Sequence, residues 1–253
     1  MLEGSKSMES FPPAADGPSQ SESSKPQVVR IIQSEVCSNA AWEAAYTRFE
    51  TPEQEIRKFT RRLIEMGVAQ WVHDAEVVEL CCGRGNGLHA LSKLGFTRLA
   101  GVDLSALLLA QYTGRATLYV CDCRRLPFDD DSKDIVIVQG GLHHLMTLPD
   151  DLEQTLSETY RVLRDDGLIV VVEPWLTPFL AFVHRVCQSS IARRVFPKIE
   201  ALATMIHHEQ QTYDQWLGQP QTIVRLFEQF FSTAWCSIKW GKYMFVGRKR
   251  TSH

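Results

Sequence analysis

The sequence predicts an α/β protein in which helices cover both faces of a mostly parallel β-sheet. From residue 77 onward, short apolar runs with many β-branched residues alternate with stretches of helical composition. The runs are apolar on both faces of the strand, as expected for strands buried between two layers of helices. With 253 residues, 44% of them hydrophobic, the chain is long enough for one complete domain of this kind.

The N-terminal part is predicted to contain an arm and a helix. Residues 1–27 are rich in Ser, Pro and Gly and nearly free of large apolar side chains. This composition predicts a disordered arm ahead of a single domain over residues 28–253. The first long helix is expected from Thr51, which can cap it, through Pro52 in its first turn, to Gly67 at its end.

The central part predicts five strands joined by helices. Gly95 and Gly167 stand where two of these helices have to end before the next strand. The expected strands cover residues 77–82, 98–103, 117–122, 134–140 and 168–174, and the expected helices cover 88–95, 105–112 and 150–167.

The C-terminal part departs from this alternation. Residues 174–219 are mostly helical by composition and longer than one ordinary crossover, which predicts a helical insertion over the sheet edge. A helix over 222–230 and two strands over 232–240 and 242–250 follow it. Gly241 separates these two strands, so we expect a hairpin and an antiparallel last strand.

A glycine-rich stretch, VVELCCGRGNG, runs from Val77 to Gly87 and begins with the first expected strand. Glycine lets the backbone approach a ligand closely, and the loop opens onto the free N–H groups of the next helix. A dinucleotide site would prefer G-x-G-x-x-G, whereas the glycines here are Gly83, Gly85 and Gly87, and Leu88 follows them. The stretch therefore predicts a cofactor-binding turn of another kind.

Three acidic residues, Glu79, Asp103 and Asp122, come at the ends of three successive strands. Glu79 is poorly placed for a pyrophosphate but well placed for a ligand with a positive charge and amine donors. Asp103 can accept hydrogen bonds from both hydroxyls of a ribose, and Asp122 can accept one from an exocyclic amine. In the absence of a phosphate-binding element, these acids predict a nucleoside with a cationic tail as the ligand.

Taken together, these motifs resemble those of the class I S-adenosylmethionine-dependent methyltransferases. VVELCCGRGNG is similar to the first motif of that family, GVDLS (101–105) to the second, and CDCRRLPFDDDSKDIVIVQ (121–139) to the third and fourth. LHHL (142–145) and the helix and strand after it resemble the small-molecule branch, which includes quinone-biosynthesis and sugar methyltransferases. The resemblance covers about residues 75–175.

The resemblance implies a Rossmann-like sheet of seven strands with an antiparallel last strand, and S-adenosyl-L-methionine as the cofactor. Glu79 and the Gly83–Gly87 loop would hold the methionine part, Asp103 the ribose, and Asp122 with the Cys123 backbone the adenine. Cys81 stands where the family commonly has glycine, so the loop differs there. The complete expected cofactor-binding set is Glu79, Cys81, Gly83, Gly85, Asp103, Leu104, Asp122, Cys123 and Gln139.

Two histidines, His143 and His144, lie at the mouth of the fourth strand, which faces the acceptor in the resembled family. A neutral imidazole there could take a proton from an acceptor hydroxyl, and His144 matches the more frequent family histidine. The alternative is that one histidine bonds the local backbone and the other is solvated, since methyl transfer often needs little beyond alignment. Trp42 and Tyr46 are candidates for a lid on the cofactor.

The sequence thus predicts a methyltransferase that acts on a small-molecule acceptor by direct in-line attack, with oxygen as the first choice of acceptor atom and carbon or nitrogen next. The insertion over 174–219 is expected to form part of the acceptor site. One alternative is a methyltransferase-like binding or scaffolding protein without turnover. Another is an NAD-dependent oxidoreductase, which Glu79 and Leu88 disfavour. The net charge of −3 and pI of about 6.2 disfavour a nucleic-acid substrate.

The cysteine usage and the hydropathy indicate the cellular setting. Of seven cysteines, four form the doublets Cys81-Cys82 and Cys121-x-Cys123, which we expect to be kept apart by an intervening strand. No metal site is therefore expected, and buried thiols fit a reducing cytoplasm. Neither a secretory signal nor an apolar run of about 20 residues is present, so we expect a cytoplasmic protein without integral membrane association. The sequence assigns no oligomeric state.

Overall fold

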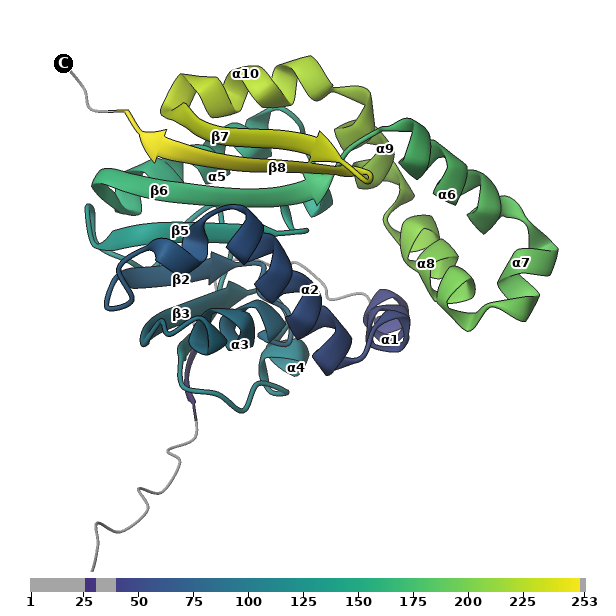
Figure 1. Cartoon of the computed structure of the whole chain (residues 1–253), viewed down its shortest axis with the longest axis horizontal. Coiled ribbons are helices and arrows are strands. Elements are labelled where there is room, and N and C mark those ends of the chain that lie inside the picture. Colours follow the sequence, from purple (N-terminus) through teal and green to yellow (C-terminus); the bar gives the residue numbers. More distant parts are fainter. Residues whose placement is uncertain (1–25, 31–39, 251–253) are drawn as a thin grey trace, which may run out of the picture.

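The computed structural model describes residues 26–30 and 40–250, which form an eight-stranded sheet with helices on both faces (Figure 1). The predicted α/β class is confirmed. The strand order is β1-β4-β3-β2-β5-β6-β8-β7. The strands are β1 (Gln27–Arg30), β2 (Glu76–Leu80), β3 (Arg98–Asp103), β4 (Thr117–Val120), β5 (Lys133–Gln139), β6 (Leu163–Pro174), β7 (Phe231–Lys239) and β8 (Lys242–Lys249).

The chain direction in the sheet agrees with the predicted antiparallel last strand. Strands β1 to β6 are mutually parallel, and β8 runs antiparallel to both of its neighbours, β6 and β7. The order reverses at β2, which has β3 on one side and β5 on the other. The carboxyl ends of β2, β3 and β5 therefore border the crevice in which open α/β sheets bind their ligands.

The sheet contains one strand more than the seven predicted. The additional strand is β1, which pairs in parallel with β4 from Gln27 opposite Thr117 to Arg30 opposite Val120. Four residues are too short to show a periodic pattern, and it is the pairing with β4 that satisfies their backbone. The predicted arm over residues 1–27 lies outside the described residues, apart from its last two positions, and Gln27 already belongs to β1.

Two apolar cores lie on opposite faces of the sheet. Val78 packs into the core that includes Phe227 of α10, whereas its neighbour Val77 packs into the core that includes Leu63 of α2. Both valines are fully buried, which explains why the strand is apolar at every position. The helices are α1 (Ala40–Phe49), α2 (Pro52–Glu65), α3 (Asn86–Lys93), α4 (Ala106–Leu109), α5 (Asp150–Val162), α6 (Pro178–Gln188), α7 (Ser190–Val195), α8 (Pro197–His208), α9 (Gln210–Gly218) and α10 (Pro220–Phe230), with 3₁₀ helices η1 (Val68–Gln70) and η2 (Leu142–His144).

The helix ends follow the local signals in some places and not in others. Thr51 caps α2 in a reciprocal capping box with Gln54, and Gly67 follows the helix with a left-handed φ of 81°, as predicted. Helix α5 ends at Val162, five residues before the predicted end at Gly167, because β6 already begins at Leu163 and pairs there with β5. Tertiary pairing overrides the helical composition at this point.

Four helices, α6 to α9, occupy the chain between β6 and α10. Helices α6, α7 and α8 extend beyond the end of the sheet, and α8 packs against α1 (Figure 1). Two segments distant in sequence thus meet over the carboxyl ends of the parallel strands. Among the described residues, no helix is both long and apolar enough to cross a membrane.

Candidate active site

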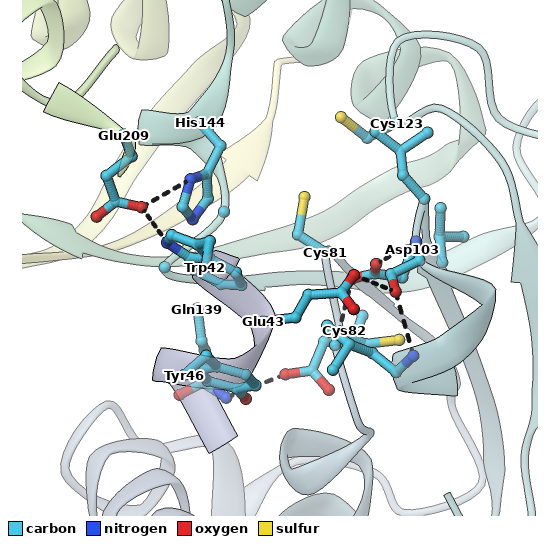
Figure 2. Close-up of a pocket in the computed structure, with 18 of the residues that line it drawn as sticks. Trp42, Glu43, Tyr46, Cys81, Cys82, Asp103, Cys123, Gln139, His144 and Glu209 are labelled. Carbon is cyan, nitrogen blue, oxygen red and sulfur yellow. Dashed lines mark hydrogen bonds and ion pairs between the residues drawn. The ribbon is translucent and has the colours of Figure 1, made fainter. Parts of the chain in front are cut away.

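A cavity of about 430 Å³ opens at the carboxyl ends of β2, β3 and β5. Its walls come from α1, α2, the loops that follow these strands and β4, and the junction between α8 and α9. Of the residues predicted from the sequence, those that line it are Glu79, Cys81, Gly83, Asp103, Leu104, Cys123, Gln139 and His144. Figure 2 labels five of them, Cys81, Asp103, Cys123, Gln139 and His144. The predicted residues that do not line it are Gly85, Asp122 and His143.

The glycines of the loop after β2 and of the first turn of α3 have different steric roles. Gly83 and Gly85 adopt left-handed φ angles of 54° and 75°, which glycine tolerates. A Cβ on Gly85 would lie 2.3 Å from the ring of Tyr112, and a Cβ on Gly87 would lie 1.8 Å from Oε1 of Glu79. Gly85 therefore shapes the loop from behind the cavity wall, and Gly87 leaves room for the Glu79 carboxylate.

Cys81 also takes a left-handed conformation, with φ of 53°, which is uncommon for a residue with a side chain. The resembled family commonly has glycine there, so the thiol occupies a backbone position suited to glycine. A hydrogen bond with Cys123 and burial raise the pKa of the Cys81 thiol well above its usual range. The cysteines that follow β2 and β4 thus meet in the cavity wall, although the sequence analysis expected β3 to keep them apart.

Glu79 and Gln139 present unpaired oxygens within the protein. Nε2 of Gln139 donates to Oε1 of Glu79 at 3.3 Å. The buried Oε2 of Glu79 and Oε1 of Gln139 have no hydrogen-bond partner among the described residues. Burial, assisted by the nearby charges of Glu55 and Asp103, raises the pKa of Glu79 to about 8. A cationic ligand with N–H donors would satisfy these oxygens and stabilise the ionised carboxylate.

Asp103 links two loops of the site. Its Oδ2 accepts from the backbone N–H of Gly83 at 2.7 Å, and its Oδ1 accepts from that of Ser105 at 2.8 Å. Burial raises the pKa of Asp103, and these two hydrogen bonds oppose the shift. The hydroxyl of Ser105 donates to Glu43 of α1 at 2.6 Å, so a second carboxylate lies close by (Figure 2). Asp103 can therefore anchor the glycine loop as well as accept from a ligand.

The Asp122 carboxylate is engaged away from the cavity. The guanidinium of Arg124 donates to both of its oxygens at 2.6–3.1 Å, and also to Asp151 at 2.7 Å. Burial raises the pKa of Asp122, but the hydrogen bonds and charge of Arg124 outweigh burial and hold the pKa below its usual value. The structure leaves Cys121, Cys123 and Leu104 in the cavity wall near this point.

Helices α1 and α2 contribute acids that the sequence analysis missed. Oε2 of Glu55 accepts from the hydroxyl of Tyr46 at 3.0 Å, from Arg84 at 3.0 Å and from Asn86 at 2.6 Å. Glu55 and Glu43 both line the cavity, but their helices are far from the glycine motif in the sequence, and no local pattern marks these two residues. Tyr46 and Trp42, the predicted lid residues, stack with ring centroids 5.3 Å apart and line the cavity.

The two histidines of η2 have different environments. Nδ1 of His143 lies 2.7 Å from Oε2 of the fully buried Glu173. Oε1 of Glu173 accepts from the backbone N–H groups of Gly141 and Leu142 at 2.8 Å each. His143 is therefore held by the protein interior, and only His144 reaches the cavity.

His144 lies beside Glu209, the junction residue between α8 and α9. Nδ1 of His144 is 3.2 Å from Oε2 of Glu209, and the indole N–H of Trp42 donates to the same oxygen at 2.7 Å (Figure 2). Burial and the charge of His143 hold the pKa of His144 well below its usual value. Glu209 lies 65 residues after His144, and no sequence motif connects them. In Figure 2 this group lies across the cavity from Asp103.

The charge of the cavity wall is one-sided. Among the described residues that line it, none is Lys or Arg. The lining carboxylates are Glu43, Glu55, Glu79, Asp103 and Glu209. Such a wall suits a cation and is poorly suited to the pyrophosphate of a dinucleotide. The orphaned buried oxygens of Glu79 and Gln139 fit the amine of S-adenosyl-L-methionine, whose sulfonium carries a further positive charge.

Comparison with known proteins agrees with this geometry. Residues 78–171, from β2 into β6, match a family described as a methyltransferase domain. The PH0226 protein of Pyrococcus horikoshii superposes with a TM-score of 0.63 at 17% identity, over 84% of this chain and all of that one. A geranyl diphosphate C-methyltransferase of Streptomyces coelicolor, solved with S-adenosyl-L-homocysteine, gives a TM-score of 0.53 at 14% identity over 75% of each chain. The chain therefore shares the fold of these solved structures, and its residues 78–171 match a methyltransferase domain.

Its sequence relatives include quinone-biosynthesis methyltransferases. A ubiquinone/menaquinone biosynthesis C-methyltransferase of Geobacter sulfurreducens is 28% identical over 166 residues, 57% of this chain and 62% of that protein. Another from Geotalea daltonii is 30% identical over 95 residues, 34% of this chain and 39% of that protein. The chain thus spans less than two thirds of either relative. A demethylmenaquinone methyltransferase of Mycolicibacterium paratuberculosis is 28% identical over 188 residues, 73% of this chain and 75% of that protein.

Proposed function

We propose that this protein transfers the methyl group of S-adenosyl-L-methionine to a small-molecule acceptor. The observation that supports this function most is the cavity at the sheet's switch point, lined by five carboxylates and, among the described residues, by no Lys or Arg. The same observation disfavours the NAD-dependent oxidoreductase, because a pyrophosphate would meet no cation there. When bound, the cofactor supplies an electrophilic methyl group on a positively charged sulfur.

The chain's own residues bind and orient the two substrates. We assign Glu79, Gln139 and the Gly83 loop to the methionine part, because their unpaired oxygens and close backbone suit an ammonium group. Asp103 is assigned to the ribose hydroxyls. Leu104, Cys121 and Cys123 form the wall nearest the place predicted for the adenine. In this assignment Asp122 does not contact the adenine. Its carboxylate binds Arg124 and thereby orders the loop after β4.

The acceptor is proposed to bind at the His144 end of the cavity. Its wall there includes Trp42, Met146 and Thr212 with His144 and Glu209, which combines aromatic and apolar surface with a few polar groups. A flat, hydroxylated ring suits such a surface. Two of the named relatives are C-methyltransferases, which favours a ring carbon beside a hydroxyl over the oxygen that was the first expectation from the sequence. The ring hydroxyl would contact His144.

A labelled-methyl assay tests this function. Purified full-length protein is incubated with S-adenosyl-L-methionine carrying a ¹³C-methyl group and with demethylated hydroquinones and simple phenols. Mass spectrometry and NMR then locate the label. We expect one labelled methyl on a ring carbon and one equivalent of S-adenosyl-L-homocysteine.

Two outcomes would point elsewhere. A label on oxygen would restore the first expectation for the acceptor atom while keeping the methyl transfer. Tight, saturable cofactor binding without a labelled product from these acceptors or from a cell extract would favour the binding or scaffolding protein instead.

A further inference from the structure

Two histidines and a carboxylate converge at the acceptor end of the cavity. Nδ1 of His144 lies 3.2 Å from Oε2 of Glu209, and Nε2 of His143 lies 3.9 Å from Oε1 of the same carboxylate. One ligand atom from each of the three residues can be chosen so that all lie within 4.8 Å of one another. Three possible metal-ligand atoms from η2 and the α8–α9 junction thus share one small volume.

The hydrogen bonds behind His143 fix the direction of its lone pair. Oε1 of Glu173 is occupied by two backbone donors, and Oε2 lies 2.7 Å from Nδ1 of His143. An ionised carboxylate only accepts, so Nδ1 carries the proton. The other ring nitrogen of His143, Nε2, faces Oε1 of Glu209 at 3.9 Å. The bond to Glu173 thus leaves Nε2 as the nitrogen of His143 that is available to an ion beside Glu209.

We propose that His143, His144 and Glu209 bind a divalent transition-metal cation of the Zn²⁺ type. Atoms that share a tetrahedral zinc ion at about 2.0–2.1 Å stand roughly 3.3 Å apart. The separation of 3.2 Å between Nδ1 of His144 and Oε2 of Glu209 fits this spacing, and that of 3.9 Å between Nε2 of His143 and Oε1 of Glu209 is wider. Binding of one ion therefore requires the three ligand atoms, which lie within 4.8 Å of one another, to move closer together. Two imidazoles with one carboxylate favour such an ion over Mg²⁺ or Ca²⁺, which prefer oxygen ligands.

Glu173 has the place of an outer-sphere partner in this site. Metal-ligating histidines almost always donate their other ring N–H to a carboxylate or a carbonyl group, which fixes the tautomer and raises the basicity of the ring. The bond from His143 to Glu173 meets this description. Trp42 of α1 orients Glu209 in a comparable way, because its indole N–H donates to the Glu209 carboxylate. Two of the three ligands, His143 and Glu209, are therefore oriented by independent contacts from β6 and α1.

The ion would leave one position open toward the cavity, where His144 and Glu209 form part of the wall. A hydroxyl bound at this position has a lowered pKa and loses its proton to solvent. The resulting oxyanion uses an electron pair for attack on the methyl carbon, directly or through the adjacent ring carbon, while the electrons of the sulfur–methyl bond pass to sulfur. After attack through the ring carbon, that carbon loses its proton to solvent, which restores the aromatic ring. This role of the ion depends on the proposed methyl transfer, whereas the binding of the ion does not.

Zinc titration of the full-length protein tests the site without any methyl-transfer assay. The chain is stripped with a chelator and titrated with Zn²⁺ against a chromophoric competitor. We expect one ion per chain, and binding at least about 100-fold weaker in Glu209→Gln and in His144→Ala, each of which removes a direct ligand. Glu173→Gln is expected to weaken binding by about 10- to 100-fold through the orientation of His143.

Two controls separate this site from adventitious binding. His207→Ala removes an exposed histidine two residues before Glu209 and should leave the zinc affinity unchanged. Cobalt substitution distinguishes the ligands, because Cys81 and Cys123 also line the cavity and thiolates give an intense charge-transfer band that imidazoles and carboxylates do not.

Any one of three results would overturn the proposal. These are the absence of saturable zinc binding, unchanged affinity in Glu209→Gln, and a thiolate band in the cobalt spectrum. Thermal melts keep the test valid if a variant is less stable, since Zn²⁺ should raise the melting temperature of the parent protein but not that of Glu209→Gln or His144→Ala. Loss of zinc binding with intact cofactor binding would leave the proposed methyl transfer standing.

Discussion

The two ends of the cavity are built in different ways. At the cofactor end, Glu79, Gly83 and Asp103 come from consecutive β-strands and the loops directly after them. At the acceptor end, Trp42, His144 and Glu209 come from α1, η2 and the junction of α8 and α9, which are far apart in the sequence. The cofactor end thus depends on local backbone geometry, and the acceptor end on contacts between distant helices.

Because of this difference, we expect the two ends of the cavity to be sensitive to different substitutions. A methyl group added in the first turn of α3, which follows the β2 loop, acts on atoms already close together, such as Gly87 and Glu79. The acceptor end instead depends on the hydrogen bond between Trp42 and Glu209, which joins α1 to the helical region after β6. We therefore expect substitutions in the first half to change cofactor affinity and substitutions in the second to change turnover.

The largest effect is expected for Gly87→Ala. The new Cβ would lie 1.8 Å from the Glu79 carboxylate, so the carboxylate or the loop has to move. We expect cofactor affinity to fall at least about 100-fold and the free energy of unfolding to fall by about 1–3 kcal/mol. Calorimetric titration and urea denaturation measure the two quantities. Gly218→Ala is the matched control, because a Cβ there meets nothing within 4 Å, and equal losses in both variants would contradict the assignment.

Asp103→Asn is expected to weaken cofactor binding by about 10- to 100-fold, or about 1–3 kcal/mol, through the loss of charge-assisted hydrogen bonds. The amide retains one oxygen that can accept from Gly83 or Ser105, so the loop keeps part of its anchor. Equilibrium titration with S-adenosyl-L-homocysteine gives the affinity. An unchanged value would remove Asp103 from the ribose site.

Glu79 should make the protein pH-sensitive. Burial raises its pKa from the ordinary value of 4.5 to about 8, so its contribution to stability is present below about pH 4.5 and is lost as the pH rises through about 8. The free energy of unfolding of the ligand-free protein should fall across this window by at most about 1.4 kcal/mol per pH unit. Glu79→Gln should abolish this part of the slope in urea denaturation.

The same group predicts proton release on cofactor binding. A cationic ligand stabilises ionised Glu79, so titration near pH 7 should release up to one proton, and affinity should rise as the pH approaches 8. Calorimetry in two buffers of different ionisation enthalpy counts the protons. Equal apparent enthalpies in the two buffers would show that Glu79 does not meet the positive charge.

A smaller effect, on turnover, is expected for His144→Ala at the acceptor end. Turnover should fall by about five- to tenfold because the acceptor loses an orienting contact, whereas cofactor affinity should change less than about twofold. Steady-state kinetics and calorimetry on the same preparation separate the two effects. If cofactor affinity fell and turnover did not, the division of the cavity into two ends would be wrong.

The smallest effect is expected for Asp122→Asn. Its carboxylate is held by Arg124 and does not line the cavity, so the cofactor affinity should fall by less than about threefold. Calorimetric titration again gives the value. A loss of more than about tenfold would instead support the contact with adenine that the resemblance implies.

The sequence could predict the part of the molecule that depends on neighbouring residues. The alternation of apolar runs and helices led to the parallel sheet, and the acids after β2 and β3 lie at the cavity as their strand positions indicate. Asp122 follows its strand by the same rule, but Arg124, two residues later, withdraws its carboxylate. A side chain's partner decides its direction, and a single sequence does not show the partner.

Other features could not be predicted because they arise only when distant segments pack. Strand β1 is too short to show a pattern and exists by pairing with β4. Glu43 and Glu55 look like ordinary solvated helix residues until α1 and α2 are placed over the strand ends. Glu209 could not be predicted either, because no residue near it in the sequence indicates that it lies beside His143 and His144 in the fold.

Helix α1 touches both ends of the cavity with two adjacent residues. Glu43 accepts from Ser105 beside the ribose position, and Trp42 donates to Glu209 beside the acceptor. A shift of this one helix would break both bonds together. By thermodynamic reciprocity, any factor by which such a shift coupled the affinity for one substrate to the presence of the other would be the same in both directions.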